Sequence, residues 1–333
     1  MVGILTNEYN VSMAHSEKIV MTTIQKIVPL EMAGLRLDQI LAELYAEYSR
    51  SKLQAWIKLG KVSVDGVQFK PKQKLEGGEL IEVDVEPEVV ITSEPENIPL
   101  DIVYEDDSMI IVNKPIGLVV HPAIGNWRGT LVNALLNHDH SLETLPRAGI
   151  VHRIDKDTSG LLMVAKTLHA HHSLTQQLQE RTIHREYLAI TRGRMTSGGT
   201  VDLPIGRHPT DRKRYVVRES GKEAITHYRV VQRYERHTLI RVKLETGRTH
   251  QIRVHMAHIR FPLLGDQVYS GRFQLPPACS EQLETQLRQY KHQALHAAKL
   301  GLEHPETDEY CEWEAPMPQD MKLMLEALAA NEK

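Results

Sequence analysis

The sequence predicts an α+β protein with two domains, a small N-terminal α/β module and a larger domain built on a mixed, largely antiparallel sheet with flanking helices. Three observations support this. The chain has 333 residues, enough for two hydrophobic cores. The stretch EPEVVITSEPENIPL at 86–100 is rich in proline and glutamate and carries no periodic pattern. Beyond it, strand-like and helix-like segments do not alternate evenly, which argues against a doubly wound parallel sheet.

Composition narrows the class of protein. Hydrophobic residues make up 41% of the chain and charged residues 25%, which is typical of a soluble globular protein. No apolar run approaches the ~18–20 residues of a membrane span, and the first residues do not resemble a secretory signal. The two cysteines, Cys279 and Cys311, form no CxxC pair, so we expect a reducing, cytoplasmic location. The net charge of −3 excludes a global positive field, so nucleic-acid binding would depend on local patches.

The first 86 residues are expected to contain a tail and a compact module. Residues 1–29 lack a clear pattern and are predicted to be a flexible tail, in which Met13 or Met21 could be the true start. Residues 30–86 form the module. Apolar residues between 37 and 48 recur at helical spacing, and Ser-Lys-Leu-Gln at 51–54 is a capping-box pattern for a second helix ending near Gly60. Short alternating strands are predicted around 62–64 and 80–85, with turns at Asp65-Gly66 and Gly77-Gly78.

Residues 87–100 are predicted to be a linker and residues 101–333 the larger domain. Within this domain we expect strands on both sides of 106–108, a short helix at 130–137 and a buried strand at 160–166. A helix is expected at 168–181 and another at 251–259. Further strands rich in β-branched and aromatic residues are expected at 185–193, 226–234 and 238–246.

Positive charge is concentrated in two places. Residues 50–74 hold seven lysines and arginines against one acid, Asp65, and a second cluster lies at 207–222 in a predicted hairpin or loop. A single basic run is as well explained by a solvated surface, but two such patches on a weakly acidic chain favour RNA binding. The residues expected to contact RNA are Arg36, Arg50, Lys52, Lys58, Lys61, Arg207, Arg212, Lys213, Arg214 and Arg248.

Motifs for several chemistries are missing from the sequence. It contains no phosphate-binding glycine motif, no GxSxG and no HExxH, and its histidine groups lack zinc spacing, so we expect no metal site. In HRIDKDTSG at 152–160, Asp155 and Asp157 would point to opposite sides of an extended loop, so they are not expected to act as a pair. One catalytic aspartate would need an arginine to keep it ionised. Composition alone, however, favours a polar turn here.

The same stretch carries a family resemblance. HRIDKDTSGLLMVAKT resembles the HRLDxxTSG signature of the RluA-type pseudouridine synthases. Four other segments resemble further motifs of that family: VNKPIGLVVHP, REYLAITRG, LETGRTHQIRVHMAHIRFPLLGDQVY and QALHAAKLGLEHP. Residues 36–85 resemble the RNA-binding module first described in small-subunit ribosomal protein four. The resemblance runs from about residue 36 to about residue 324, nearly the whole chain.

The resemblance implies an isomerase without a cofactor, which detaches uracil from its ribose and rejoins it through carbon 5. It implies that Asp155 is the catalytic aspartate, that Tyr187 stacks on the base, that Arg253 pairs with the aspartate, and that Arg153 fills the gap left by a flipped base. The implied partner is large-subunit ribosomal RNA or the assembling large subunit, with the helix-69 stem-loop as target and the enzyme acting as a monomer.

Small departures and two alternatives accompany this resemblance. Ile154 stands where leucine is usual, Arg185 where lysine is commoner, and Phe261 where a histidine often lies. None removes a reacting group, although each could alter the choice of RNA site. A non-catalytic ribosome-assembly factor would show the same basic patches, and the same chemistry could act on transfer RNA.

Overall fold

The chain divides into two compact units, residues 1–92 and 93–333, which are treated separately below. The computed structural model describes residues 4–7, 21–45, 50–85, 94–122, 126–211, 213–277 and 279–332. Within these ranges the side chains of 4–7, 21–22, 51–52 and 85 are not described.

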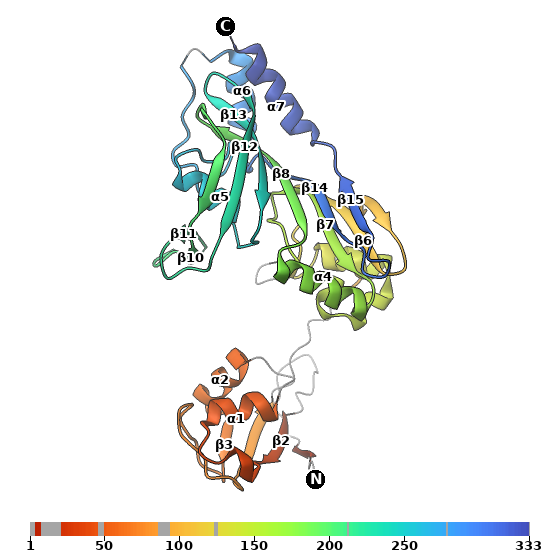
Figure 1. The fold of residues 1–333 in the computed structure, drawn as a ribbon, viewed down its shortest axis with the longest axis vertical. Helices are drawn as coiled ribbons and strands as arrows, with labels where there is room; N and C mark the ends of the chain where they lie inside the picture. The colour runs from red at the N-terminus through yellow and green to blue at the C-terminus, as the bar shows by residue number, and fades with distance from the viewer. Residues whose placement is uncertain are drawn as a thin grey trace, which may run out of the picture. The chain divides into compact units, whose positions relative to one another are not determined.

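The N-terminal unit is an antiparallel sheet with two helices (Figure 1). The strand order is β1-β2-β4-β3, formed by β1 (Ile4–Asn7), β2 (Met21–Ile27), β4 (Leu80–Val85) and β3 (Val62–Val64). A short 3-10 turn (Leu30–Met32) precedes α1 (Leu37–Leu44) and α2 (Arg50–Lys58). The apolar faces of both helices, together with alternate residues of β3 and β4, form one buried cluster.

The helix ends in this unit follow the local chemistry of the sequence. α2 begins one residue earlier than the capping-box pattern indicated and is followed by Gly60, whose φ of +72° is the left-handed conformation that glycine tolerates. Asp65 and Gly66 both have positive φ, which fits the predicted turn after β3.

Two described parts of the predicted flexible tail are the strands β1 and β2, and residues 1–3 and 8–20 lie outside the described residues. Residues 21–27, placed in the tail by their sequence, form β2, which pairs along its length with β4 and lies between β4 and β1. The sequence MTTIQKI carries little apolar alternation, and Ile24 packs on the core while Ile27 is 65% exposed. Backbone hydrogen bonds to β4, rather than a buried apolar face, therefore define this strand.

The predicted linker at 87–100 also proves partly structured. Residues 86–93 lie outside the described ranges, but 94–100 are attached to the larger unit. The backbone carbonyl of Glu94 accepts a hydrogen bond from Asn133 Nδ2 at 2.8 Å, and Glu96 accepts the backbone N–H of Gly129. These contacts fix the segment that leads into the larger unit.

The larger unit is built on a nine-stranded mixed sheet. The main strand order is β5-β6-β7-β14-β8-β13-β12-β9, and β15 pairs with β14 off this path. Only the β7–β14 pair is parallel among the described pairs, which confirms the predicted mixed, largely antiparallel sheet. The strands are β5 (Ile102–Glu105), β6 (Met109–Lys114), β7 (Ser159–Ala165), β8 (His184–Arg192), β9 (Gly199–Asp202), β12 (Ile225–Arg233), β13 (His237–Leu244), β14 (Leu295–Glu303) and β15 (Tyr310–Glu314).

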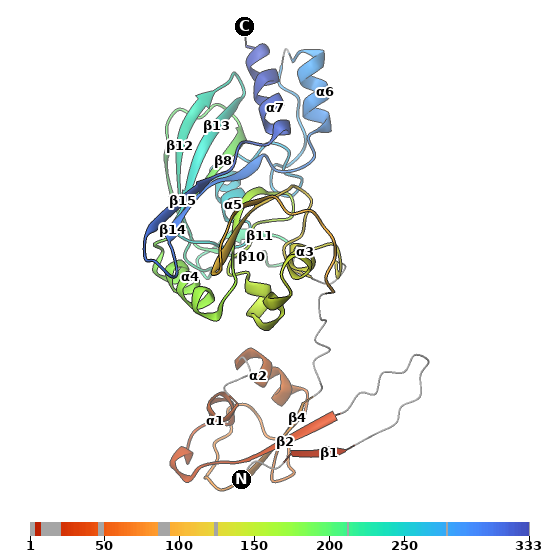
Figure 2. The same cartoon turned by 90° about the vertical axis from the view of Figure 1, so that its right-hand side faces the viewer.

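Helices cover both faces of this sheet. On one face, α3 (Leu131–His138) and α5 (Gln251–His258) pack against alternate residues of β6, β7, β8 and β13. On the other, α4 (Leu168–Glu180) packs near β7, while α6 (Glu281–Gln289) and α7 (Gln319–Ala330) lie side by side (Figure 2). Two 3-10 segments (His140–Thr144 and Pro146–Gly149) follow α3, and a separate hairpin joins β10 (Ile205–Arg207) to β11 (Tyr215–Val217).

The central strand β14 sets the register around which the site is built. Ala297 of β14 lies opposite Gly160 of β7 on one side and opposite Tyr187 of β8 on the other. A Cβ atom added to Gly160 would lie 2.2 Å from the carbonyl oxygen of Ala297, so only glycine fits there. This row of three residues brings the HRIDKDTSG loop, which ends at Gly160, close to Tyr187.

Candidate active site

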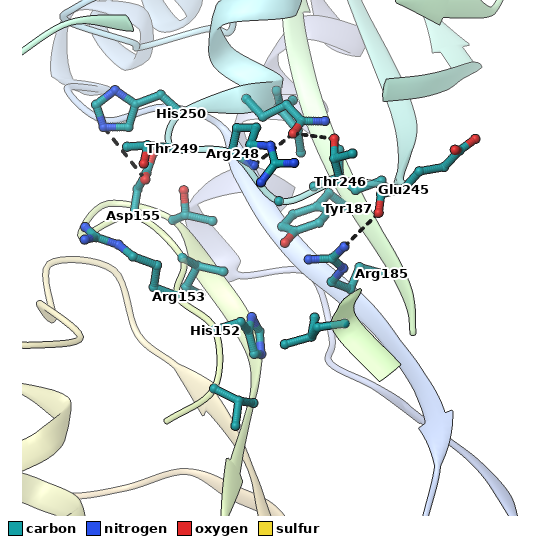
Figure 3. Close-up of a pocket in the computed structure, with 18 of the residues that line it drawn as sticks. His152, Arg153, Asp155, Arg185, Tyr187, Glu245, Thr246, Arg248, Thr249 and His250 are labelled. Carbon is teal, nitrogen blue, oxygen red and sulfur yellow. Dashed lines mark hydrogen bonds and ion pairs between the residues drawn. The ribbon is translucent and has the colours of Figure 1, made fainter. Parts of the chain in front are cut away.

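A cavity of about 810 Å³ opens where the HRIDKDTSG loop, the start of β8, the loop after β13 and the start of α5 meet (Figure 3). Its lining is strongly basic although the whole chain is weakly acidic. Two acidic side chains, Asp155 and Glu245, line it together with six arginines. The arginines are Arg147, Arg153, Arg181, Arg185, Arg248 and Arg253. Such a lining favours a polyanionic ligand of nucleotide size.

Asp155 is held by an arginine that a second aspartate fixes. Arg253 of α5 donates from Nη1 to Asp155 Oδ2 at 2.9 Å, and from Nε and Nη2 to Asp266 at 2.7 and 3.0 Å. Burial opposes the charge of Arg253, but the carboxylates of Asp266 and Asp155 raise its pKa above the ordinary value. Asp266 is fully buried, whereas the Asp155 side chain keeps 17% exposure toward the cavity. The arrangement therefore presents an oriented carboxylate.

Hydrogen bonds from Lys114 and Gln293 hold the loop that carries Asp155 in place. The ammonium group of Lys114, at the end of β6, is buried and donates to the carbonyls of Pro115, Leu118 and Lys156 at 2.7–2.9 Å. Burial lowers its pKa to about 8. The Thr158 N–H donates to the carbonyl of Asp155, and the Thr158 hydroxyl accepts from Gln293. These bonds fix the loop to β6 and to the segment before β14.

Tyr187 and Arg185 project from β8 into the same side of the cavity. Side chains two apart on a strand share a face, and here that face carries Tyr187 and Ala189 into the core. Tyr187 is 7% exposed, and burial raises its pKa. Figure 3 shows Arg185 beside it, with Asp155 and His250 across the cavity. The site thus combines a carboxylate, an aromatic ring and a buried guanidinium.

His250 lies between Asp155 and the hydroxyl group of Tyr269. The backbone N–H of Tyr215 donates to the Tyr269 hydroxyl oxygen at 2.9 Å, and that hydroxyl lies 2.8 Å from His250 Nδ1. The other ring nitrogen, Nε2, lies 3.8 Å from Asp155 Oδ1, so the imidazole bridges Tyr269 and the carboxylate. Burial lowers the pKa of His250, which favours its neutral form.

The structure brings some of the predicted residues together and leaves others apart. Asp155, Tyr187, Arg253, Arg153 and Arg248 all line the cavity. Arg248 and Arg253, five residues apart, would not share one face of a helix. Both line the cavity because Arg248 lies in the loop before α5, where its Nε donates to the carbonyl of Glu223.

The remaining predicted RNA contacts are not among the residues that line this cavity. Lys213 is exposed, while Arg207 and Arg214 lie over the rings of Tyr215 and Tyr269. In the N-terminal unit Arg50 and Lys58 are exposed and Lys61 is partly buried, but Arg36 is bound by Asp38 in a bidentate pair. Arg212 and the side chain of Lys52 lie outside the described residues.

Several site residues were not identified from the sequence as functional. Arg185 was noted only as a departure from lysine, although a charged residue two before Tyr187 must share its face. His250 and Asp266 both lie inside the long segment that resembles the arginine motif, but no spacing rule links them to Asp155. Lys114 lies in VNKPIGLVVHP, where only its burial reveals its role.

The described residues contain neither a metal-binding cluster nor a membrane-spanning helix. No group of three or more His, Cys, Asp or Glu side chains lies close enough together there to hold a metal ion. In the same residues no helix combines the length and apolarity needed to cross a membrane.

Comparison with known proteins agrees with these motifs. Residues 108–258 match the family model described as RNA pseudouridylate synthase, and residues 35–81 match the S4 domain. Proteins named ribosomal large subunit pseudouridine synthase D are similar over most of their length. The one from Pseudomonas aeruginosa is 52% identical over 90% of this chain and 94% of its own, and the one from Escherichia coli is 53% identical over 90% and 92%.

A solved structure is similar as well. Human RNA pseudouridylate synthase domain containing 4 superimposes with a TM-score of 0.55 at 27% identity, over 68% of this chain and 92% of its own. The matched segment 108–258 contains Asp155, Tyr187 and Arg253, so it includes the core of the basic cavity. The chain therefore belongs to the RNA pseudouridylate synthase family, as an isomerase acting on RNA that carries an N-terminal S4 domain.

Proposed function

We propose that this enzyme isomerises uridine in large-subunit ribosomal RNA, with Asp155 as a covalent nucleophile acting on a flipped-out base. The observation that carries the proposal is the oriented Asp155 carboxylate, fixed by Arg253 in a basic cavity that Tyr187 also lines. The choice of RNA is supported by the names of relatives that are about half identical over nine-tenths of the chain.

The recessed position of Asp155 supports base flipping. Asp155 lies among arginines within a cavity, where a uridine stacked in a helix could not present its glycosidic bond. Extruding the base costs a few kcal/mol, and less in a loop than in a stem. Stacking on Tyr187 would return on the order of 1–3 kcal/mol. The basic lining would hold the phosphates on either side of the flipped nucleotide.

The reaction exchanges one bond at the ribose for another. The bond between C1′ and N1 breaks, the bond between C1′ and C5 forms, the C5 proton leaves, and N1 gains a proton. Asp155 attacks either the sugar or the ring, so that one difficult step becomes two easier ones. The fixed guanidinium of Arg253 orients the carboxylate through a hydrogen bond to Oδ2, while Oδ1 lies 3.8 Å from His250 Nε2.

The wider proposal concerns target and setting. The target carried over from the family resemblance is the helix-69 stem-loop, modified in the cytoplasm by a monomer. The S4 domain, with exposed Arg50 and Lys58, would supply contacts to RNA beyond the flipped nucleotide. Mapping pseudouridines in ribosomal RNA from cells with and without the protein tests this target. Loss of pseudouridine elsewhere, with helix 69 unchanged, would contradict it.

A pair of neighbouring aspartates gives a matched test of the nucleophile. Asp155→Asn should abolish release of tritium from RNA labelled at uridine C5, while RNA binding is retained. Asp157→Asn makes the same chemical change two residues away in the same loop, and that variant should keep its activity. Isomerisation by Asp155→Asn at a rate near that of the wild type would exclude Asp155 as nucleophile.

A further inference from the structure

Arg185 is a buried cation without an acidic partner. The residue is 7% exposed, and no carboxylate of the described residues forms an ion pair with it. Its one hydrogen bond in the described structure runs from Nη2 to the backbone carbonyl of Glu245 at 3.3 Å, and its buried Nε donates to no acceptor there. Buried guanidinium groups are normally satisfied on most of their donors, so this arrangement is costly unless a ligand completes it.

The surroundings of Arg185 aim its guanidinium at the base rather than at the RNA backbone. It lines the cavity beside Tyr187, two residues along the same face of β8 (Figure 3). The loop after β13 closes over it so tightly that a Cβ atom on Gly247 would lie 2.8 Å from Nη1. By contrast, Arg153 is exposed, and Arg181 is already paired with Glu223 at the surface. Those two are better placed for phosphates.

We propose that Arg185 donates hydrogen bonds to the O4 carbonyl oxygen of the flipped uracil, and so both selects uracil and stabilises the charge that develops on it. This inference rests on the proposed function, because it needs a base seated on Tyr187. Neutral stacking residues alone would not distinguish uracil from cytosine, whose amino group replaces the O4 acceptor. A buried donor discriminates strongly, since the wrong base leaves it unpaired.

The same contact assists the chemistry by either route. If Asp155 attacks the sugar, the electrons of the broken C1′–N1 bond remain on uracil and spread to O2 and O4. If Asp155 adds to C6 of the ring, the electron pair of the C5–C6 double bond moves toward O4 as an enolate. In each case a fixed cation at a carbonyl oxygen stabilises the new charge more than the ground state.

Thiocarbonyl substrates provide the test. An RNA that the full-length enzyme modifies is prepared with uridine, 2-thiouridine or 4-thiouridine at the modified position, because sulfur accepts hydrogen bonds poorly. Single-turnover rates at saturating RNA are compared for the wild type, Arg185→Gln and Gly247→Ala. Gly247→Ala keeps the arginine but displaces its guanidinium. Arg181→Gln is the matched control. It also removes an arginine that lines the cavity, but the guanidinium of Arg181 is already paired with Glu223.

The expected result is a specific loss of discrimination. The wild type and Arg181→Gln should modify the 4-thiouridine substrate about tenfold more slowly than the uridine substrate. Arg185→Gln should turn over uridine about a hundredfold more slowly than the wild type. The rates of Arg185→Gln on the thio and uridine substrates should be nearly equal. The ratio of the two rates for Gly247→Ala should lie between those of Arg185→Gln and the wild type. If Arg185→Gln fails to fold, Gly247→Ala decides the question by the same ratio.

Two results would overturn the inference. One is an unchanged thio penalty in Arg185→Gln and Gly247→Ala. The other is an equal loss on all three substrates with a weaker dependence of RNA affinity on salt, which would make Arg185 a phosphate contact. Neither depends on Asp155, because each ratio compares substrates within one variant. Activity remaining in Asp155→Asn would instead contradict the proposed nucleophile.

Discussion

Replacing Asp266 by asparagine isolates the contribution of the buried carboxylate that holds Arg253. Asp266 lies 2.7 Å from Arg253 Nε, a distance at which two charges attract by about 6 kcal/mol at an effective dielectric constant of ~20. Desolvation offsets part of this attraction, and breaking such a buried pair typically costs about 3–5 kcal/mol. Because Arg253 keeps Asp155 as a partner, we expect about 3 kcal/mol. For a unit of this size the midpoint of thermal unfolding should fall by about 6–12 °C.

The same substitution should slow catalysis without weakening RNA binding. Asp266 is fully buried and cannot touch RNA, so KM should stay near the wild-type value. Arg253 would lose its bidentate support and Asp155 its fixed orientation, which should lower kcat about a hundredfold. Calorimetry and tritium release measure the two effects, and Asp157→Asn controls for the lost charge. A melting midpoint within about 2 °C of the wild type, with kcat retained, would refute the assigned role of Asp266.

Three further predictions follow from other parts of the structure. Gly160→Ala should prevent folding of the larger unit or lower its melting temperature severely, as measured by circular dichroism. Gly117 also has positive φ, but a Cβ atom there would meet no atom within 4 Å, so Gly117→Ala should lower the free energy of unfolding by only about 1 kcal/mol. Burial lowers the pKa of His237 to about 4 from an unfolded value of 6.5, so the unfolded chain alone takes up this proton between those values. This histidine alone should therefore lower the free energy of unfolding by about 3 kcal/mol as the pH drops from 7 to 4. His237→Gln should reduce the pH dependence in urea titrations by that amount; an unchanged dependence would contradict it. Arg50→Ala and Lys58→Ala should each lower RNA affinity and reduce its logarithmic salt slope by about 1, while Arg36→Ala, whose charge Asp38 already pairs, should change both less.

Periodicity and turn chemistry predicted most of the fold. The helix α1 follows from apolar spacing, and the end of β3 at Asp65-Gly66 follows from residues that tolerate positive φ. β2 could not be predicted in this way, because backbone pairing with β4 holds it and few of its side chains are apolar. Its identity depends on residues some sixty positions later in the chain.

The candidate site was predictable only in part. Motif resemblance pointed to Asp155 and Arg253, and the structure shows them 2.9 Å apart. It gave no reason to link Asp266 or His250 to them, since those contacts arise only when α5 packs on the sheet. The sequence also could not predict that Arg185, a charged residue near the start of a strand, is buried.

The position of β14 has a consequence for how the enzyme comes into being during translation. In the described sheet, β7 and β8 do not pair with each other and are joined only through β14, which begins at Leu295. A chain emerging from the ribosome would complete its S4 domain early. Asp155 and Tyr187 would stay on two unconnected half-sheets until the last tenth or so of the sequence had been made. The nascent chain would therefore be able to bind RNA before it could modify RNA. A chain truncated before Leu295 would bind RNA but have no isomerase activity.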